Sequence, residues 1–496
     1  MRSRDLPRTR ARVATLVIAA TLVGGCGDDG REGDALVDAG GDGVSDSAGD
    51  RGTRDGGADL ESEAGSGLAA PTGVSAVGLR PVVAVSWDAV GGVVTYRVIR
   101  DGVEIAEVGG TSYLDTFAGS SAPATCASHT YTVRSVAAGG ALSEPSAPAT
   151  SALPVKNVVL MIGDGMGPEH ERAAGCFLFG GAYGAPGSQL SFQRFPRAGL
   201  VQTASASAAI TDSAAAATAM ATGHAVNNGV VSVALPGDGS DLYTLLECFA
   251  ERGRVTGLVT TTEISHATPA GFGAHAESRN NVSEIVADYL DGSRPNLLLG
   301  GRAGGGMTVG KAQTAGYQVV TTRTELAAVT GAPPMVSGQF ADGHLPYEYD
   351  AARARTDPYQ SIPHLDEQTE RALALLGAHP GGFFLMVEGG RIDHASHAND
   401  LARMVDEMVA FESAVEVVRA WASTRDDTLV LVTADHETGG LAVGACGAAG
   451  TLPPASWSSG GHTSANVNVY ALGPLSERFV GTIPNTAFFD LVTSGD

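Results

Sequence analysis

The stretch FFLMVEGGRIDHASHAN, residues 383–399, carries the strongest structural signal in the chain. Its first part, Phe383–Val387, is an apolar run of the kind that forms a strand buried on both faces of a parallel sheet. Glu388 follows directly, at the end of the strand where open α/β sheets bind their ligands. If a helix begins after the two glycines, Asp393 and His397 stand at positions i and i+4 and share one face. Carboxylates and imidazoles are zinc ligands, so the stretch indicates a metal site; two incidental histidines at a solvated helix start are the alternative.

Residues 155–496 alternate apolar strand patterns with helical patterns, which predicts an α/β domain with a mostly parallel sheet and helices on both faces. The clearest strands are Val158–Ile162, Val255–Thr260, Asn296–Leu299, Phe383–Val387 and Thr428–Val432. The clearest helices are Leu365–Leu376 and Leu401–Trp421. Ligand sites of such sheets lie beyond the carboxyl ends of the strands, so the residues that follow these strands are the candidates for function.

Candidate metal ligands stand next to several of these strands. They are Asp164 in Gly163-Asp164-Gly165, His266 and Thr268 after the strand Val255–Thr260, Asp435 and His436 after Thr428–Val432, and His462 before a further strand at Asn466–Leu472. Together with Glu388, Asp393 and His397, they form a set of carboxylates, imidazoles and hydroxyls that suits several divalent ions.

A candidate nucleophile, Ser213, lies in Thr211-Asp212-Ser213-Ala214, ahead of an alanine-rich helical run that reaches Met220. A serine at a helix start has an exposed hydroxyl, and the backbone amides there favour an anion. The alternative is that Ser213 or Asp212 simply caps the helix. No general base is evident nearby, but metal coordination can activate a serine without one.

The first 25 residues have the features of an export signal peptide. Five arginines between Arg2 and Arg12 precede an apolar run, Val13 to Val23, that is too short to span a membrane as a stable helix. The run ends in Val23-Gly24-Gly25-Cys26, which resembles a bacterial lipoprotein lipobox. This resemblance implies cleavage before Cys26 and lipidation of its thiol, so that the mature protein is exported and lipid-anchored to a bacterial membrane. An ordinary secretory signal with a chance cysteine is the alternative.

Residues 26–67 are predicted to form a disordered tether. From residue 27 onward the segment contains twelve acidic and three basic residues and hardly any large apolar side chain. Such a composition cannot bury enough apolar area to fold.

Residues 68–154 are predicted to form a small all-β domain. Val82–Trp87, Thr95–Arg100 and Thr130–Val136 alternate apolar and polar residues, and Arg100-Asp101-Gly102 is typical of a hairpin turn. The spacing of these strands and their aromatic residues resembles a fibronectin type III domain. The aromatic side chains are expected in its core rather than in a ligand site.

Length, charge and cysteine content limit the possible functions. A chain of 496 residues exceeds the about 250–300 residues that one hydrophobic core supports, so more than one domain is expected. The formal charge of −23 argues against nucleic acid as a partner, although bound metal ions can still attract small phosphate substrates. The five cysteines form no CxxC pair, and this spacing argues against a cysteine zinc site. Whether Cys126, Cys176, Cys248 and Cys446 include a disulfide is left open.

Six motifs give the second half of the chain a family resemblance. They are NVVLMIGDGMG at 157–167, TDSAAAATAMATG at 211–223, TTTEISHATPAGFGAH at 260–275, FFLMVEGGRIDHASH at 383–397, TLVLVTADHETGG at 428–440 and GHT at 461–463. In this order they resemble the alkaline phosphatase family, from about Lys156 to the C-terminus. The resemblance implies that family's central sheet and the hydrolysis of small phosphate monoesters through a phosphoserine. It leaves homodimer formation open.

Carried over position by position, the resemblance also implies two zinc ions and one magnesium ion. The ligands would be Asp393, His397 and His462 for the first zinc, Asp164, Asp435 and His436 for the second, and Asp164, Thr268 and Glu388 for magnesium. Ser213 would be the nucleophile and Arg279 the phosphate clamp, while His266 and His394 would tune the third site. The alternatives are a phosphodiesterase or sulfatase of the same superfamily, or an inert adhesion protein.

Overall fold

The computed structural model describes residues 67–79, 82–116, 129–151, 153–304, 306–331, 335–354 and 359–494. The predicted signal peptide, Cys26, the tether up to residue 66 and Cys126 lie outside these residues. Within the described ranges, none of the helices has the length and apolar character needed to cross a membrane.

Two small antiparallel sheets form the all-β domain. Their strands are β1 (Ser75–Leu79), β2 (Val82–Ser86), β3 (Thr95–Arg100), β4 (Val103–Val108), β5 (Ser112–Asp115), β6 (Thr130–Val136) and β7 (Ala149–Thr150). One sheet has the order β1-β2-β5 and the other β4-β3-β6-β7. Trp87, Tyr96 and Tyr131 are buried in the core, as expected. Asp101 and Gly102 have positive φ angles, 51° and 82°, and form the predicted turn between β3 and β4.

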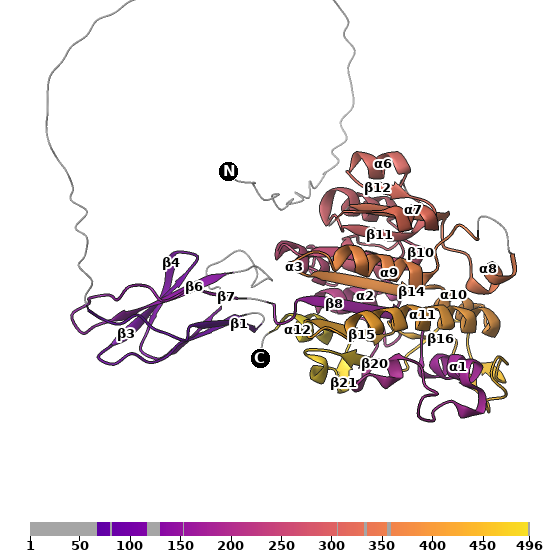
Figure 1. The fold of residues 1–496 in the computed structure, drawn as a ribbon, viewed down its shortest axis with the longest axis horizontal. Helices are drawn as coiled ribbons and strands as arrows, with labels where there is room; N and C mark the ends of the chain where they lie inside the picture. The colour runs from indigo at the N-terminus through magenta and orange to yellow at the C-terminus, as the bar shows by residue number, and fades with distance from the viewer. Residues whose placement is uncertain are drawn as a thin grey trace, which may run out of the picture. The chain divides into compact units, whose positions relative to one another are not determined.

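A ten-stranded sheet organises the rest of the chain (Figure 1). In spatial order its strands are β12 (Gln318–Val320), β13 (Val336–Asp342), β11 (Leu297–Arg302), β10 (Val255–Glu263), β14 (Phe383–Gly389), β8 (Asn157–Gly163), β15 (Thr428–Thr433), β20 (Val467–Leu472), β9 (Arg197–Gln202) and β21 (Gly481–Pro484). All pairs from β12 to β15 are parallel, and β20 pairs antiparallel with both β15 and β9. The predicted α/β fold with a mostly parallel sheet is confirmed.

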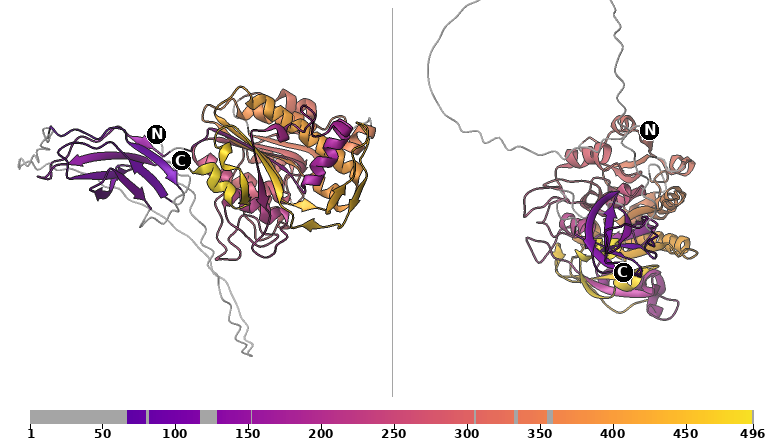
Figure 2. Two further views of the ribbon diagram at one scale, coloured as in Figure 1. Left: turned by 90° about the horizontal axis from the view of Figure 1, so that it is seen from below. Right: turned by 90° about the vertical axis from the view of Figure 1, so that its left-hand side faces the viewer.

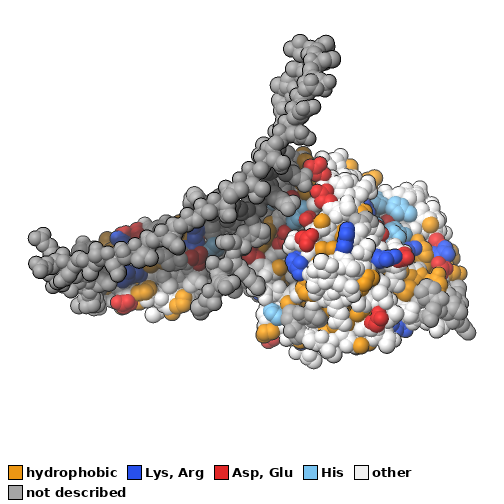
Figure 3. Space-filling model, turned by 90° about the horizontal axis from the view of Figure 1, so that it is seen from above, with side chains coloured by type: hydrophobic (Ala, Val, Ile, Leu, Met, Phe, Trp, Pro, Cys, Tyr) orange, Lys and Arg blue, Asp and Glu red, His pale blue; other side chains and the backbone are white. Residues whose placement is uncertain are grey.

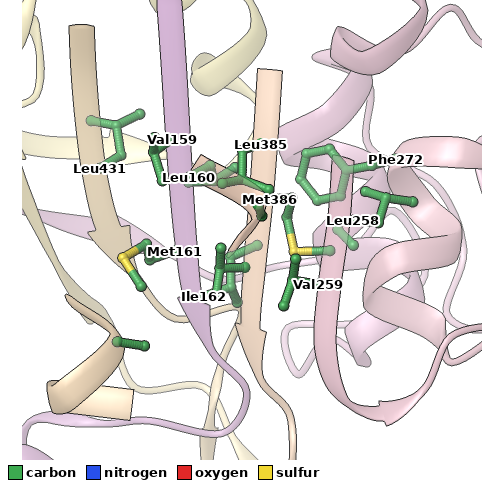
Figure 4. Close-up of a cluster of buried hydrophobic side chains, with 14 of the residues drawn as sticks. Val159, Leu160, Met161, Ile162, Leu258, Val259, Phe272, Leu385, Met386 and Leu431 are labelled. Carbon is green, nitrogen blue, oxygen red and sulfur yellow. The ribbon is translucent and has the colours of Figure 1, made fainter. Parts of the chain in front are cut away.

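The middle of the sheet is buried on both faces. Every residue of β8 and of β14 is buried, as the apolar runs of the sequence predict. Figure 4 shows Leu160, Met386 and Leu258 on three neighbouring strands of this core, with Phe272 packed beside them. This rigid layer fixes the positions of the residues that follow each strand.

Helices cover both faces of the sheet (Figures 1 and 2). One set consists of α9 (Leu365–Leu376) and α11 (Leu401–Ala422), with α1 (Pro168–Phe179) and α8 (Glu348–Ala354) against α11. The other set consists of α2 (Ser213–Thr222), α3 (Leu245–Glu251), α4 (Ala267–Gly273) and α12 (Ala487–Thr493). The shorter elements are α5 (Val282–Ala287), η3 (Asp288–Gly292), α6 (Val309–Thr314), α7 (Arg323–Ala328), α10 (Arg391–His397), β16 (Glu437–Thr438), β17 (Leu441–Val443), β18 (Ala455–Trp457) and β19 (His462–Thr463).

A disulfide joins Cys176 on α1 to Cys446 in the loop between β17 and β18, across 270 residues of sequence. The cysteine spacing left open whether these residues form a disulfide, and this bond answers the question for Cys176 and Cys446. The bond ties the first helix of the α/β domain to the segment that leads toward His462.

Candidate active site

The predicted site residues converge at the carboxyl ends of the central strands. Ile162, near the end of β8, pairs with Glu388 on β14, while β15 lies parallel on the other side of β8. Because these strands end at the same level, Glu388 near the end of β14 lies close to Asp164, which follows β8, and to Asp435 and His436, which follow β15. The turn from β10 into α4 brings His266 and Thr268 to the same edge.

Gly165 allows a close approach between the turn after β8 and helix α10. Its φ angle is +76°, and a Cβ atom at this position would lie 2.9 Å from both Cα of Asp393 and Oγ1 of Thr438. A side chain would therefore be strained and would also collide with its neighbours. Glycine at this position lets Asp164 stand close to the donors on α10.

The first donor cluster consists of Asp393, His397 and His462. The two histidine Nε2 atoms are 3.1 Å apart, and the Asp393 carboxylate lies 3.3 Å from Nε2 of His397 and 3.6 Å from that of His462. Nδ1 of His397 donates to the carbonyl of Gly460 and Nδ1 of His462 to that of Thr211, at 2.7 and 2.9 Å. Each neutral ring therefore keeps a lone pair on Nε2. Two nitrogen lone pairs and a carboxylate that face one another can bind a cation. The backbone carbonyls that accept from Nδ1 hold both rings in the orientation that a metal ligand needs.

The second donor cluster consists of Asp164, Asp435 and His436, all fully buried. Nε2 of His436 lies 3.5 Å from Asp164 Oδ1 and 3.2 Å from Asp435 Oδ2. Thr438 Oγ1 donates to Asp393 Oδ1 at 2.6 Å and lies 3.3 Å from Nδ1 of His436. Because Thr438 donates its hydroxyl hydrogen to Asp393, it accepts a hydrogen bond from Nδ1 of His436. Nε2 of His436 therefore keeps its lone pair, which faces the carboxylates of Asp164 and Asp435.

The third donor cluster consists of Asp164, His266 and Glu388, and Thr268, also predicted for it, is a side-chain neighbour of Glu388. Both carboxylate oxygens of Asp164, Oγ1 of Thr268, Oε1 of Glu388 and Nδ1 of His266 are buried without hydrogen-bond partners among the described residues. Buried polar atoms are rarely left unpaired, because the lost hydration is expensive. The cluster fits a bound cation that supplies the missing interactions.

Electrostatics also favours bound cations. Burial raises the pKa of Asp164 well above its ordinary value, and the neighbouring carboxylates of Asp435, Asp393 and Glu388 raise it further. Burial likewise raises the pKa of Glu388 to about 7, although Thr260 donates a hydrogen bond to it. The hydrogen bond and the negative charge of Asp393 raise the pKa of His397 to about 9. So many buried carboxylates need positive charge beside them.

Ser213 is the first residue of α2 and is buried beside the second cluster. Its Oγ lies 3.2 Å from Nε2 of His436. Asp212 caps the helix by accepting from the backbone N–H of Ala215 at 3.0 Å. The cap and the nucleophile candidate are therefore adjacent residues with separate tasks, rather than alternatives.

Arg279 is held at the mouth of the site by two side chains. Its Nη1 donates to Asp212 Oδ2 at 3.1 Å, and its Nη2 lies 3.2 Å from Nε2 of His266. Its side chain is 25% exposed, so the guanidinium borders both solvent and the donor clusters. This placement agrees with the prediction of a phosphate clamp, whose role itself stays a prediction.

The structure adds one histidine that the sequence analysis missed. His344, just after β13, lies with ring centroids 4.6 Å from His394 and 5.5 Å from His266, and its Nδ1 accepts the backbone N–H of Glu263. Histidine side chains gather near arginine and acidic side chains on the face shown in Figure 3. The signal was available in principle, because Asp342-Gly343-His344 follows a strand, but β13 was not among the strands predicted.

Known proteins resemble this chain in sequence and in fold. The family model described as alkaline phosphatase matches residues 155–297 and 286–453. Alkaline phosphatase 3 of Bacillus subtilis is 33% identical to this chain, in a match that covers 67% of this chain and 87% of the relative. The streptomycin-6-phosphate phosphatase of Streptomyces griseus is 34% identical, in a match that covers 71% of this chain and 92% of the relative. The crystal structure of a cold-active alkaline phosphatase from Shewanella sp. superposes with a TM-score of 0.60 and 31% identity, covering 68% of this chain and 98% of that one. The chain is therefore a phosphatase enzyme that belongs to the alkaline phosphatase family.

Proposed function

We propose that the enzyme hydrolyses phosphate monoesters through a phosphoserine on Ser213, with two zinc ions and one magnesium ion as cofactors. The observation that carries this proposal is the position of Ser213 Oγ. It lies 3.2 Å from Nε2 of His436, in a cluster where carboxylate oxygens of Asp164 and Asp435 are buried without hydrogen-bond partners among the described residues. The first two clusters combine carboxylates with imidazoles, the ligands that zinc accepts, and the third offers oxygen atoms, which magnesium prefers. When bound, such cations lower the pKa of a hydroxyl and neutralise charge on the entering and leaving oxygens.

The protein groups would divide the remaining work. Ser213 loses its hydroxyl proton and attacks phosphorus opposite the ester oxygen; the ester P–O bond breaks, and the leaving oxygen takes up a proton to depart as the alcohol. The first backbone amides of α2 would stabilise the phosphoryl oxygens. Arg279 binds two of these oxygens with two of its N–H groups, while Asp212 keeps the guanidinium in place. Water then hydrolyses the phosphoserine, which regenerates the Ser213 hydroxyl and releases inorganic phosphate.

A phosphodiesterase or sulfatase of the same superfamily is the second candidate. Thr268, Glu388 and Arg279 favour the monoesterase, because they complete a third cation site and bind a doubly charged group. We further propose an exported, lipid-anchored enzyme whose small substrates are phosphate monoesters rather than nucleic acids, with a fibronectin-like domain as spacer. An inert adhesion protein would be expected to lack at least one of the ligands.

Removal of the metal ions tests the proposal directly. Dialysis against a chelator should abolish hydrolysis of a chromogenic phosphate monoester, and zinc together with magnesium should restore it. Metal analysis of the purified protein and the rate on a matching diester are measured alongside. Full activity in metal-free protein would rule out the proposed chemistry, and faster diester than monoester hydrolysis would favour the second candidate.

A further inference from the structure

The turn at Asn228 and Gly229 lies between two segments of the active site. The side chain of Asn228 binds the segment that precedes α2: its Oδ1 accepts the backbone N–H of Asp212 at 3.1 Å, and its Nδ2 donates to the carbonyl of Ile210 at 3.0 Å. The carbonyl of Gly229 accepts the backbone N–H of Arg279 at 2.7 Å. One turn therefore contacts both the residue that caps α2 and the residue predicted to hold phosphate.

The two backbone partners determine how the amide of Asn228 is oriented. A backbone N–H can only donate and a backbone carbonyl can only accept, so the amide oxygen faces Asp212 and the amide nitrogen faces Ile210. The side chain thus provides the two hydrogen bonds that a neighbouring strand would otherwise provide. Asn228 is exposed, so water can replace both bonds when the side chain is removed. The fold as a whole should therefore not depend on them.

Gly229 completes the attachment of Asp212. Its backbone N–H donates to Asp212 Oδ1 at 3.0 Å, and the same oxygen accepts the N–H of Ala215 in the first turn of α2. The φ angle of Gly229 is +86°, a conformation in which a side chain would be strained. Oδ1 of Asp212 is therefore held by backbone groups, and Oδ2 is left for Nη1 of Arg279, 3.1 Å away.

The carboxylate of Asp212 is charged in this arrangement. Burial by itself raises the pKa of Asp212, but hydrogen bonds from the backbone of Ala215 and Gly229 and the charge of Arg279 outweigh it and hold the pKa below its ordinary value. A charged carboxylate forms a strong hydrogen bond with a guanidinium. A shift of Asp212 would therefore also shift the guanidinium of Arg279.

The backbone of the turn is joined to the segment that carries Arg279. Val231 and Ala276 exchange two backbone hydrogen bonds, at 3.0 and 2.9 Å, and the bond between Gly229 and Arg279 continues this pairing. The turn and Arg279 thus form one unit. Asn228 connects that unit to the backbone of Asp212, and so determines where the carboxylate lies relative to the guanidinium.

We propose that Asn228 is a positioning residue for phosphate binding, which acts through Asp212 on Arg279. It keeps the Asp212 carboxylate where Oδ2 can orient the guanidinium toward the phosphoryl oxygens. Without Asn228, the backbone of Asp212 can shift, and the guanidinium loses part of the geometry that a bidentate contact needs. The inference rests on the proposed function for the role of Arg279 as phosphate clamp.

Steady-state kinetics of Asn228→Ala test this role. KM for a chromogenic monoester and the inhibition constant of inorganic phosphate should rise together, because both ligands use the same guanidinium. kcat should change less, because a loosened clamp weakens the ground state and the transition state alike. We expect kcat/KM to fall about three- to tenfold, the scale of one or two hydrogen bonds. Asn281→Ala, on an exposed asparagine that donates to Glu284, is the matched control and should resemble wild type.

A double-mutant cycle separates this role from a merely structural one. If Asn228 acts through Arg279, Asn228→Ala should have no further effect on kcat/KM, within about twofold, in the Arg279→Ala background. A loss that persists in that background, or no loss in the single variant at equal metal content, would overturn the inference alone. Wild-type monoester kinetics in Arg279→Ala would overturn the clamp of the proposed function and, with it, the role of Asn228.

Discussion

Ser213 is the residue that tests the covalent route most directly. Its Oγ is beside His436 at the start of α2, where a phosphoryl group would meet the helix amides. Ser213→Ala should therefore lose nearly all monoester hydrolysis while it keeps its metals. Brief acid quenching of the wild type with labelled substrate should trap phosphate on the Ser213 peptide. Ser207→Ala, on an exposed serine, is the control; label elsewhere, or none with unimpaired turnover, would contradict the phosphoserine.

Arg279 separates monoester from diester chemistry. A monoester dianion offers its oxygens to a bidentate guanidinium, whereas a diester places a further group in that space and carries less charge. Arg279→Ala should cost monoester hydrolysis about 1.5–3 kcal/mol, the scale of hydrogen bonds to charged groups, or about ten- to a hundredfold in kcat/KM. Diester hydrolysis should fall much less, and inhibition by inorganic phosphate should weaken. Equal losses on both esters, at equal metal content, would show that Arg279 does not recognise the monoester charge.

The sequence placed individual residues well where a strand end or helical spacing identified them. Asp393 and His397 share one face of α10, as the i, i+4 spacing predicted. Thr438 and His344 were not predicted to belong to the site. Their importance depends on which hydrogen bonds they make, Thr438 with Asp393 and His344 with the backbone of Glu263, and neither bond follows from sequence spacing.

At the scale of elements, His275 joins three separate segments. It follows α4, its Nε2 lies 3.5 Å from Glu247 on α3, and its Nδ1 lies 3.6 Å from Asp288 on η3. Burial by itself lowers the pKa of His275, but hydrogen bonds with the Asp288 and Glu247 carboxylates outweigh it and raise the pKa to about 10. Because the folded pKa exceeds the ordinary value of about 6.5, this stabilisation is complete below pH about 6.5 and disappears as the pH rises through about 10.

We therefore expect His275→Gln to lower the free energy of unfolding at pH 6, and the difference from wild type to shrink as the pH rises from about 6.5 and to be largely gone above pH 10. Urea unfolding at several pH values and fixed metal concentration measures this difference. A difference that stays constant from pH 6 to 10.5 would mean that the charge of His275 does not stabilise the fold.

The sequence predicted the elements with long apolar runs and missed shorter ones. Strands β8, β10, β14 and β15 and helices α9 and α11 were identified nearly to their ends. β13, Val336–Asp342, was missed because its Ser, Gly and Gln residues hide a buried strand. The antiparallel part of the sheet, where β20 lies between β15 and β9, depends on contacts between distant segments that no local pattern reveals.

At the scale of the whole molecule, the chemistry should be confined to the α/β domain. All the predicted site residues follow Lys156, and Arg254 Nη1 holds the carbonyls of Val155 and Lys156 at 2.6 Å. A chain that begins at Pro154 keeps these contacts and should retain the wild-type kcat while it loses membrane association. Steady-state kinetics and fractionation with membranes measure the two properties. A large loss of kcat in the folded, metal-loaded shorter chain would give the N-terminal domain a part in the site.

The position of β8 has a consequence for the timing of maturation. It is the first strand of the α/β domain along the chain, yet both of its neighbours, β14 and β15, come from the last third of the sequence. The third donor cluster therefore needs Glu388 beside Asp164, the second needs Asp435 and His436, and the first is complete only with His462. A growing chain that has not yet reached Glu388 holds no complete cluster, and all three are complete only when His462 has been added. Under the proposed function, metal binding would therefore be a late event in the folding of the chain.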